Sequence, residues 1–359
     1  MAIPLFDSRT PLEPLREQLH EALERVLDSG RFILGPEVEA FEREFAQHLG
    51  ARHAIGVANG TDALTIALRA MGVGPGDEVV VPSFTFYATA EAVPHTGATP
   101  IFADIDPATM LITADTVRAV LTPRTKAVIA VHLFGNVAPV EEIEALGVPV
   151  LEDAAQAAGS IAPGGRRPGA LGTAATFSFY PSKNLPAFGD AGAISTSDDE
   201  VAERARLLRF HGSSDKERFE LVGYNSRLDA IQAAILRVLL PHLDGWATAR
   251  QAAAAAYEAA GLGDLVTLTQ TAPGSRAAWH LYVVRTPDPD GLAVKLASQG
   301  IEARGYYRVP LHRQTSLQAA AELPHTDAAS ATNLALPIGP ALTDEQVAEV
   351  VTAVAAAVG

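Results

Sequence analysis

Residues 148–156 read Val-Pro-Val-Leu-Glu-Asp-Ala-Ala-Gln, a short apolar run followed at once by acidic and amide side chains. Val148–Leu151 has the length and composition of a buried β-strand, so Asp153 is expected at its carboxyl end. Similar runs precede it, and helical stretches separate several of them: Glu78–Val81, Pro100–Ala103 and Lys126–Val131. Apolar strands that alternate with helices are typical of an α/β sheet that is largely parallel and covered on both faces.

The segments around this core extend the pattern. Near the start of the chain, apolar residues at helical spacing predict two helices. The first is expected to end at Gly30 and the second at Gly50. A strand at His53–Ala58 and a helix at Ala63–Met71 follow them. Two further strands are expected after the quoted segment, at Ala174–Phe179 and Gly192–Thr196.

A second, smaller α/β lobe is expected in the carboxyl-terminal third. The helix Leu228–Leu240 is expected to end near Pro241 and a turn at Asp244-Gly245. Beyond it, we expect strands at His280–Arg285 and Ile301–Arg304, each followed by a helix. We therefore predict a large domain over residues 1–243, with its amino-terminal segment, and a small domain over residues 244–359.

Composition excludes several classes of protein. The 359 residues are 48% hydrophobic and 19% charged, which fits a globular chain. A net charge of −15 argues against binding to nucleic acid or to an anionic membrane. The absence of cysteine rules out disulfides and cysteine-ligated metals, and the 10 histidines show no metal-ligand spacing, so no metal site is expected. With no signal peptide or membrane span apparent, the cytoplasm is the expected location.

The turn Asn59-Gly60-Thr61-Asp62 joins an expected strand to an expected helix. A helix start offers unpaired N–H groups and partial positive charge, which suits a phosphate. Gly60 allows close approach of the backbone, and Thr61 adds a hydroxyl. The alternative is a plain helix cap without a ligand.

Asp153 and Gln156 form the second candidate. A carboxylate at the end of a buried strand lies where open α/β sheets bind ligands, and it could pair with a protonated ring nitrogen of a cofactor. Gln156 lies one turn further along if a helix starts there, and could donate a hydrogen bond beside it. The alternative is again a helix cap.

Lys183 is the third candidate. It follows an apolar strand and lies in a loop with unusually few polar residues. A lysine in a partly desolvated pocket has a lowered pKa and can act as an amine nucleophile in Schiff-base chemistry. The alternative is a solvated loop lysine.

Together these segments resemble a known family. Over nearly its whole length the chain resembles the sugar aminotransferases of the DegT/DnrJ/EryC1/StrS family, which use pyridoxal 5'-phosphate (PLP). The resemblance implies a type I PLP-dependent transferase of the aspartate aminotransferase-like α/β fold, with a mixed, mostly parallel sheet in the large domain and a smaller C-terminal α/β domain. The motifs that carry it are residues 29–36 (SGRFILGP), 59–62 (NGTD), 82–86 (PSFTF), 152–156 (EDAAQ), 177–185 (FSFYPSKNL) and 223–229 (GYNSRLD).

The resemblance implies a role for each residue that matches these motifs. Lys183 is at the position of the lysine that forms the internal aldimine and moves a proton as general base and acid. Asp153 would pair with the pyridinium nitrogen, and Gln156 would hydrogen-bond the phenolic oxygen of the ring. Phe86 would stack on the ring. The phosphate would be held by Gly60, Thr61 and Ser178, and by Asn225 from the neighbouring subunit of a homodimer.

The implied reaction moves an amino group from L-glutamate to a keto-sugar attached to a nucleoside diphosphate. Lys216, Arg218 and Arg227 are expected near the diphosphate, and Tyr306, Tyr307 and His312 near the sugar. The residues around the lysine resemble those of members that aminate C3 of a dTDP- or UDP-3-keto hexose. Amination at C4 remains an alternative. Two others are a PLP- or pyridoxamine-dependent sugar dehydratase, whose well-known representatives have histidine in place of the lysine, and a non-catalytic regulatory member of the fold.

Overall fold

The computed structural model describes residues 2–317 and 319–358, and its larger lobe contains a seven-stranded sheet. The strands lie in the order β1-β7-β6-β5-β4-β2-β3. Strand β7 runs antiparallel to its neighbours β1 and β6, whereas the other neighbouring pairs are parallel. The expected mixed and mostly parallel sheet is thus confirmed. Their bounds are β1 (His53–Val57), β2 (Glu78–Pro82), β3 (Thr99–Ala103), β4 (Thr125–Val131), β5 (Val150–Asp153), β6 (Ala174–Ser178) and β7 (Gly192–Thr196).

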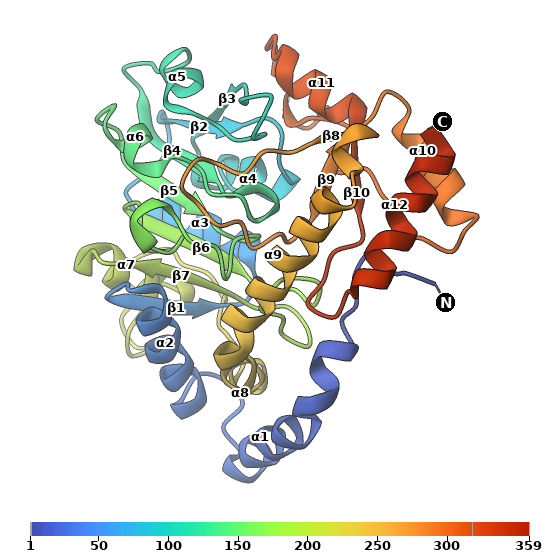
Figure 1. The fold of residues 1–359 in the computed structure, drawn as a ribbon. Coiled ribbons are helices and arrows are strands. Elements are labelled where there is room, and N and C mark those ends of the chain that lie inside the picture. The colour runs from blue at the N-terminus through green and yellow to red at the C-terminus, as the bar shows by residue number, and fades with distance from the viewer. Residues whose placement is uncertain (1, 318, 359) are drawn as a thin grey trace.

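Helices cover both faces of this sheet (Figure 1). Along β4, Ile129 faces the core that includes α3 (Gly60–Ala70) and α7 (Asp199–Arg209), and the adjacent Val128 faces a core on the opposite side. None of the described helices is long and apolar enough to cross a membrane. The other helices of this lobe are α1 (Arg16–Ser29), α2 (Pro36–Leu49), α4 (Tyr87–Glu91), α5 (Ala114–Arg118), α6 (Val140–Glu144) and α8 (Ala230–Leu239).

The smaller lobe contains a three-stranded antiparallel sheet, with the order β10-β9-β8. Ile3, from the start of the chain, packs into the core of this lobe and bridges to Ile301. A few amino-terminal residues therefore associate with the small lobe, while the division after residue 243 stays a prediction. The elements are α9 (Leu243–Ala259), β8 (Thr267–Leu268), β9 (Tyr282–Arg285), α10 (Pro289–Ala297), α11 (Pro324–Thr332), β10 (Asn333–Leu336) and α12 (Asp344–Val358).

Two local predictions are wrong. Ile301–Arg304 forms no strand, because it makes only isolated bridges to Ile3 and Ala335, and the third strand of the small sheet is β10. Asp244-Gly245 makes no turn, since both residues lie in the first turn of α9. A single 3-10 turn, Leu240–His242, contains Pro241 and separates α8 from α9, and Leu243 at the start of α9 is buried.

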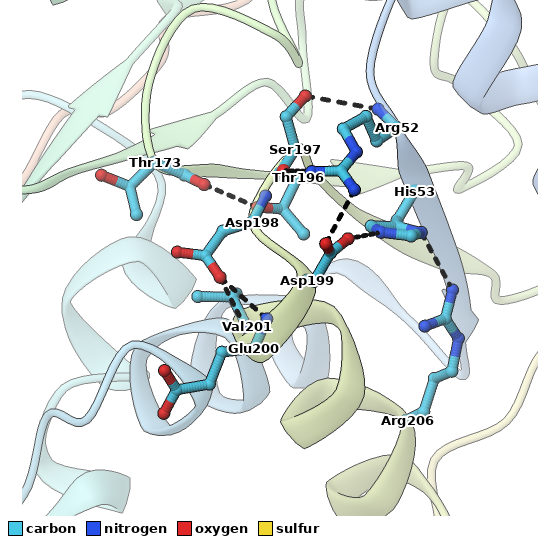
Figure 2. Close-up of polar contacts among 10 residues, drawn as sticks. All are labelled: Arg52, His53, Thr173, Thr196, Ser197, Asp198, Asp199, Glu200, Val201 and Arg206. Carbon is cyan, nitrogen blue, oxygen red and sulfur yellow. Dashed lines mark hydrogen bonds and ion pairs between the residues drawn. The ribbon is translucent and has the colours of Figure 1, made fainter.

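A polar network ties α7 to the edge of the sheet where β1 begins and β7 ends (Figure 2). Asp199 accepts a hydrogen bond from the Arg52 guanidinium at 2.7 Å, and its other oxygen lies 2.7 Å from Nε2 of His53. Asp198 caps the helix by accepting from two backbone N–H groups. The cavity described below lies at the opposite edge, so we assign this network a structural role.

Glu152 is a fully buried carboxylate that joins three segments of the large lobe. His132 Nδ1 accepts a backbone hydrogen bond at 3.0 Å, so its Nε2 carries the proton and donates to Glu152 at 2.9 Å. At 2.8–2.9 Å the carboxylate also accepts from the backbone N–H groups of Gly169, Leu171 and Gly172.

We predict that Glu152→Ala lowers the free energy of unfolding by about 3 to 5 kcal/mol, because it leaves several buried donors without an acceptor. Urea denaturation followed by circular dichroism measures the change. The matched control is Glu24→Ala at an exposed position, with an expected change within about 0.5 kcal/mol. Equal effects of the two substitutions would contradict the structural role of Glu152.

Candidate active site

A cavity of about 920 Å³ lies at the edge of the large sheet where β1, β5 and β6 end. This volume is typical of a small-molecule site, and the carboxyl ends of parallel strands are where such sheets bind ligands. Residues of both lobes line the cavity. Among the residues singled out from the sequence, it brings together Gly60, Thr61, Phe86, Asp153, Gln156, Ser178, Lys183, Tyr306 and Tyr307.

Lys183 lies in the loop between β6 and β7, which is anchored at both ends. The strand before it is held by aromatic packing, with the rings of Phe177 and Phe45 4.9 Å apart. The Lys183 N–H donates to the carbonyl of Tyr180 at 2.8 Å, and Asn184 Nδ2 donates at 3.0 Å to a carbonyl of the small lobe shortly before β9. These contacts fix the backbone from which the half-buried lysine reaches the cavity.

Burial governs the charges of Lys183 and Asp153. It lowers the pKa of Lys183 to about 8, against the opposing effect of the Asp153 carboxylate. Burial also raises the pKa of Asp153, although hydrogen bonds from the Thr89 hydroxyl (2.8 Å) and the Ala155 N–H (3.2 Å) oppose this rise. With a pKa of about 8, roughly a tenth of the amine is uncharged at pH 7, far more than for a lysine of ordinary pKa, and the uncharged form is the nucleophile.

The start of α3 provides a site suited to an anion. Asn59 caps the helix by accepting from the Asp62 N–H at 2.8 Å, so neither Thr61 nor Asp62 is the capping residue. Gly60 lies so close to β6 that a Cβ atom there would come within 2.8 Å of the Ser178 Cβ. The first turn of the helix and two hydroxyl side chains thus line one end of the cavity, in the arrangement that binds phosphate.

Gln156 is oriented by two hydrogen bonds. No helix begins at Asp153, so it is not a helix cap, and the chain makes tight turns after it. Gln156 Oε1 accepts from the Phe134 N–H at 2.7 Å, and Nε2 donates to the Tyr307 hydroxyl at 3.0 Å. The side chain of Phe86 lines the same cavity and is 57% exposed, which leaves its ring available for contact with a planar ligand.

The four residues expected from the segment 216–227 do not line the cavity of their own subunit. Asn225 pairs with Phe210 through the backbone. The charged groups of Lys216 and Arg227 lie 5.1 and 5.8 Å from the centre of the Phe210 ring. Arg218 lies in the same loop, where its N–H donates to the Asp215 carboxylate.

His312 is buried next to the cavity without lining it. Its Nδ1 lies 2.8 Å from the Ser83 hydroxyl, and its Nε2 lies 3.3 Å from the Asp327 carboxylate. Burial lowers the pKa of His312, although Asp327 opposes the effect. The contact with Ser83 holds the segment that follows Tyr306 and Tyr307 against the large lobe, and the contact with Asp327 ties it to α11.

The cavity is also lined by residues that had not been singled out from the sequence, among them Thr89, His280 and Arg304. Thr89 lies in α4 and donates to Asp153, a contact that no spacing rule reveals. His280 is 4% exposed, and its Nδ1 has no hydrogen-bond partner among the described residues. Burial shifts the pKa of His280 well below the usual value, so the ring is uncharged. Arg304 brings a cation to the cavity from the small lobe.

Comparison with known proteins identifies the family. Residues 14–355 match the DegT/DnrJ/EryC1/StrS aminotransferase family. The chain belongs to this family. It is 44% identical to a "Pleiotropic regulatory protein" of Geobacillus stearothermophilus, with 99% of this chain and 98% of that protein covered. It is 45% identical to a "dTDP-3-amino-3,4,6-trideoxy-alpha-D-glucose transaminase" of Streptomyces venezuelae, with 98% and 95% covered.

The structural comparison agrees with this assignment. The crystal structure of S. venezuelae DesV in complex with a ketimine intermediate superposes with a TM-score of 0.95 at 44% identity, and covers 98% of this chain and 97% of that one. The prediction of the aspartate aminotransferase-like fold is thereby confirmed. As a member of the DegT/DnrJ/EryC1/StrS family, the protein is an aminotransferase.

We predict that the amine of Lys183 in the cofactor-free protein reacts with an acylating reagent with a pH midpoint near 8, because burial disfavours the ammonium form. In Asp153→Asn the midpoint should fall, since the carboxylate charge holds the lysine pKa up. Mass spectrometry of the Lys183 peptide measures modification, with the exposed Lys126 in the same digests as the internal reference. An unchanged or raised midpoint in Asp153→Asn would contradict the charge coupling.

Proposed function

We propose that the protein is a PLP-dependent transaminase that moves an amino group from L-glutamate to a nucleoside-diphosphate keto-sugar. The observation that carries the proposal is the pairing of Lys183, with its lowered pKa, and the buried Asp153 in one cavity. The proposed substrate class also rests on the similarity to the S. venezuelae sugar transaminase. Bound PLP would supply an electron sink for the carbanion formed at the reacting carbon.

Lys183 has two roles in this proposal. Its amine would bind the cofactor covalently, which requires the uncharged form that burial of this side chain makes more abundant. The same amine would serve as the general base that accepts a proton from the reacting carbon and as the acid that returns it. Anchoring of the loop by Asn184 keeps the amine within reach of both positions.

The remaining residues fit the shape and charge of PLP. The carboxylate of Asp153, costly to bury alone, gains a partner in the protonated ring nitrogen. At the other end, Gly60, Thr61 and Ser178 would bind the phosphate. Between them, Phe86 would stack on the ring, and Gln156 would donate to the phenolic oxygen, because its amide nitrogen is oriented away from the backbone N–H of Phe134.

We infer a homodimer with shared active sites. Phe86 and Tyr180 line the cavity, yet are 57% and 55% exposed, so the cavity is only partly enclosed by its own subunit. Asn225 does not line this cavity, although its motif belongs to those that carry the family resemblance. Both observations fit a second copy that covers the opening, with Asn225 of the partner subunit reaching the phosphate.

The sugar nucleotide requires cations, because the protein as a whole has a net charge of −15. We assign contact with the diphosphate to Lys216, Arg218 and Arg227, which lie on the same loop as Asn225. An unchanged KM for the sugar nucleotide after removal of these three charges would contradict the assignment. Tyr306 and Tyr307 line the cavity on the small-lobe side, where we place the sugar.

We assign amination to C3 of a dTDP- or UDP-3-keto hexose. The printed name of the S. venezuelae relative, a 3-amino sugar transaminase, supports this position. NMR of the product would place the amine, and an amine at C4 would contradict the assignment. Lys at position 183 favours transamination over dehydration. Because the G. stearothermophilus relative is named a regulatory protein, a regulatory role is the alternative function. The spectral response to L-glutamate distinguishes the two.

We predict that the PLP-loaded protein shows an internal-aldimine absorption band, and that excess L-glutamate converts it to the pyridoxamine form. Lys183→Ala should lack the internal-aldimine band, because the amine that forms the imine is gone. Absorption spectra before and after addition of glutamate measure both effects. A band that persists with glutamate would contradict the proposed donor or favour a regulatory protein. The absence of a band in the wild-type protein would contradict the cofactor.

We predict that two inactive variants, Lys183→Ala and Asn225→Ala, restore activity when their subunits are exchanged. One site of each hybrid dimer then combines an intact Lys183 with an intact Asn225 of the partner subunit. A random mixture should recover up to about a quarter of wild-type activity, since half of the dimers are hybrids with one intact site. A coupled assay of 2-oxoglutarate release measures it.

The matched control mixes Lys183→Ala with Gln156→Ala. Gln156 and Lys183 line the cavity of the same subunit, so their hybrids contain no intact site and should stay inactive. Failure of the Asn225 mixture to recover activity, despite subunit exchange shown by mass spectrometry, would contradict the shared site.

A further inference from the structure

The Gln156 amide has one hydrogen for Tyr307 and a second for a ligand. Its Oε1 is engaged by the Phe134 N–H at 2.7 Å, which excludes the flipped amide. Nε2 carries two hydrogens, and one points to the Tyr307 hydroxyl at 3.0 Å. Because Gln156 lines the cavity, its second hydrogen can be donated to a ligand there. The hydroxyl of Tyr307 thus helps set the direction of that second donor.

Tyr307 is itself held by the small lobe. Arg304 lies three residues before Tyr307 and exchanges backbone hydrogen bonds of 2.8 and 3.2 Å with Ala335 of β10. The Tyr306 N–H donates to the side chain of the buried Asn333, also in β10, at 2.7 Å. The position of the Tyr307 hydroxyl therefore depends on the small sheet.

The Tyr307 ring is also enclosed by large-lobe aromatics. Its centre lies 6.2, 6.1 and 6.3 Å from those of Phe84, Phe86 and Phe134. Burial raises the pKa of Tyr307, so the phenol keeps its proton at neutral pH. A protonated hydroxyl can accept from Gln156 and donate its own hydrogen at the same time.

We propose that Tyr307 is a positioning residue through which the small lobe holds the Gln156 amide against the phenolic oxygen of the cofactor. The inference rests on the proposed function. A hydrogen bond donated to that oxygen draws off negative charge that otherwise stabilises the proton on the adjacent imine nitrogen. The contact between Tyr307 and Gln156 therefore lowers the pH at which the imine with Lys183 loses its proton, and it adds a role for Tyr307 beyond contact with the sugar.

The test is the pH midpoint of the internal-aldimine spectrum of the PLP-loaded dimer. Tyr307→Phe keeps the ring and removes the hydroxyl, and should raise the midpoint by roughly 0.5 to 1 pH unit. Gln156→Ala should raise it at least as much. In the double variant Tyr307→Phe should add nothing further, because the hydroxyl acts through the amide. The other charged or imidazole groups that line the cavity are unchanged in all of these variants: Asp62, Asp153, Asp190, His280, Arg304 and Arg308.

Tyr306→Phe is the matched control, since Tyr306 lies in the same segment and lines the cavity without a hydrogen bond to Gln156, and it should leave the midpoint unchanged. A midpoint unchanged in Tyr307→Phe but raised in Gln156→Ala would overturn the inference. So would additive shifts in the double variant, which would mean that Tyr307 acts on the cofactor independently. A wild-type protein without an aldimine band would instead contradict the proposed function. Melting temperatures of the variants identify any loss of folding.

Discussion

The site depends on a carboxylate that burial makes costly. Asp153 ends β5 inside the large lobe at 6% exposure, with donated hydrogen bonds from Thr89 and the backbone of Ala155. These neutral donors only partly replace water, and the pKa of the carboxyl is raised as a result. The Asp153 charge raises the pKa of Lys183, but burial of the lysine lowers that pKa by more. The attraction between the two groups does not offset the cost of burying their charges. A cationic ring bound beside Asp153 would supply the missing counter-charge.

The order of the strands explains why these groups meet. The antiparallel β7 lies between β1 and β6, so the turn after β1 and the loop after β6 emerge at the same edge as Asp153. Gly192, at the start of β7, permits this closeness, because a Cβ there would lie 2.5 Å from the Asn59 backbone. The ion network of Asp199 with Arg52 and His53 lies at the other edge of the same sheet (Figure 2).

Much of this architecture could be predicted because its signals are local. The apolar strands of the large sheet, the helix stops at Gly30 and Gly50, and the acidic end of β5 can each be read within a few residues. The hydrogen bond between Gln156 and Tyr307 could not be, since it joins residues 151 positions apart. Likewise, β10 has four residues directly after a helix, too few for a periodic signal, and Ile301–Arg304 has strand composition but makes only isolated bridges.

The central claim is that Lys183 carries the cofactor, and borohydride reduction of the PLP-loaded protein tests it most directly. Reduction converts the imine to a stable secondary amine, so peptide mass spectrometry identifies the modified lysine. We expect the phosphopyridoxyl group on the peptide containing Lys183, and its loss when glutamate is added before reduction. A label on another lysine, or no label on a PLP-loaded protein, would contradict the account.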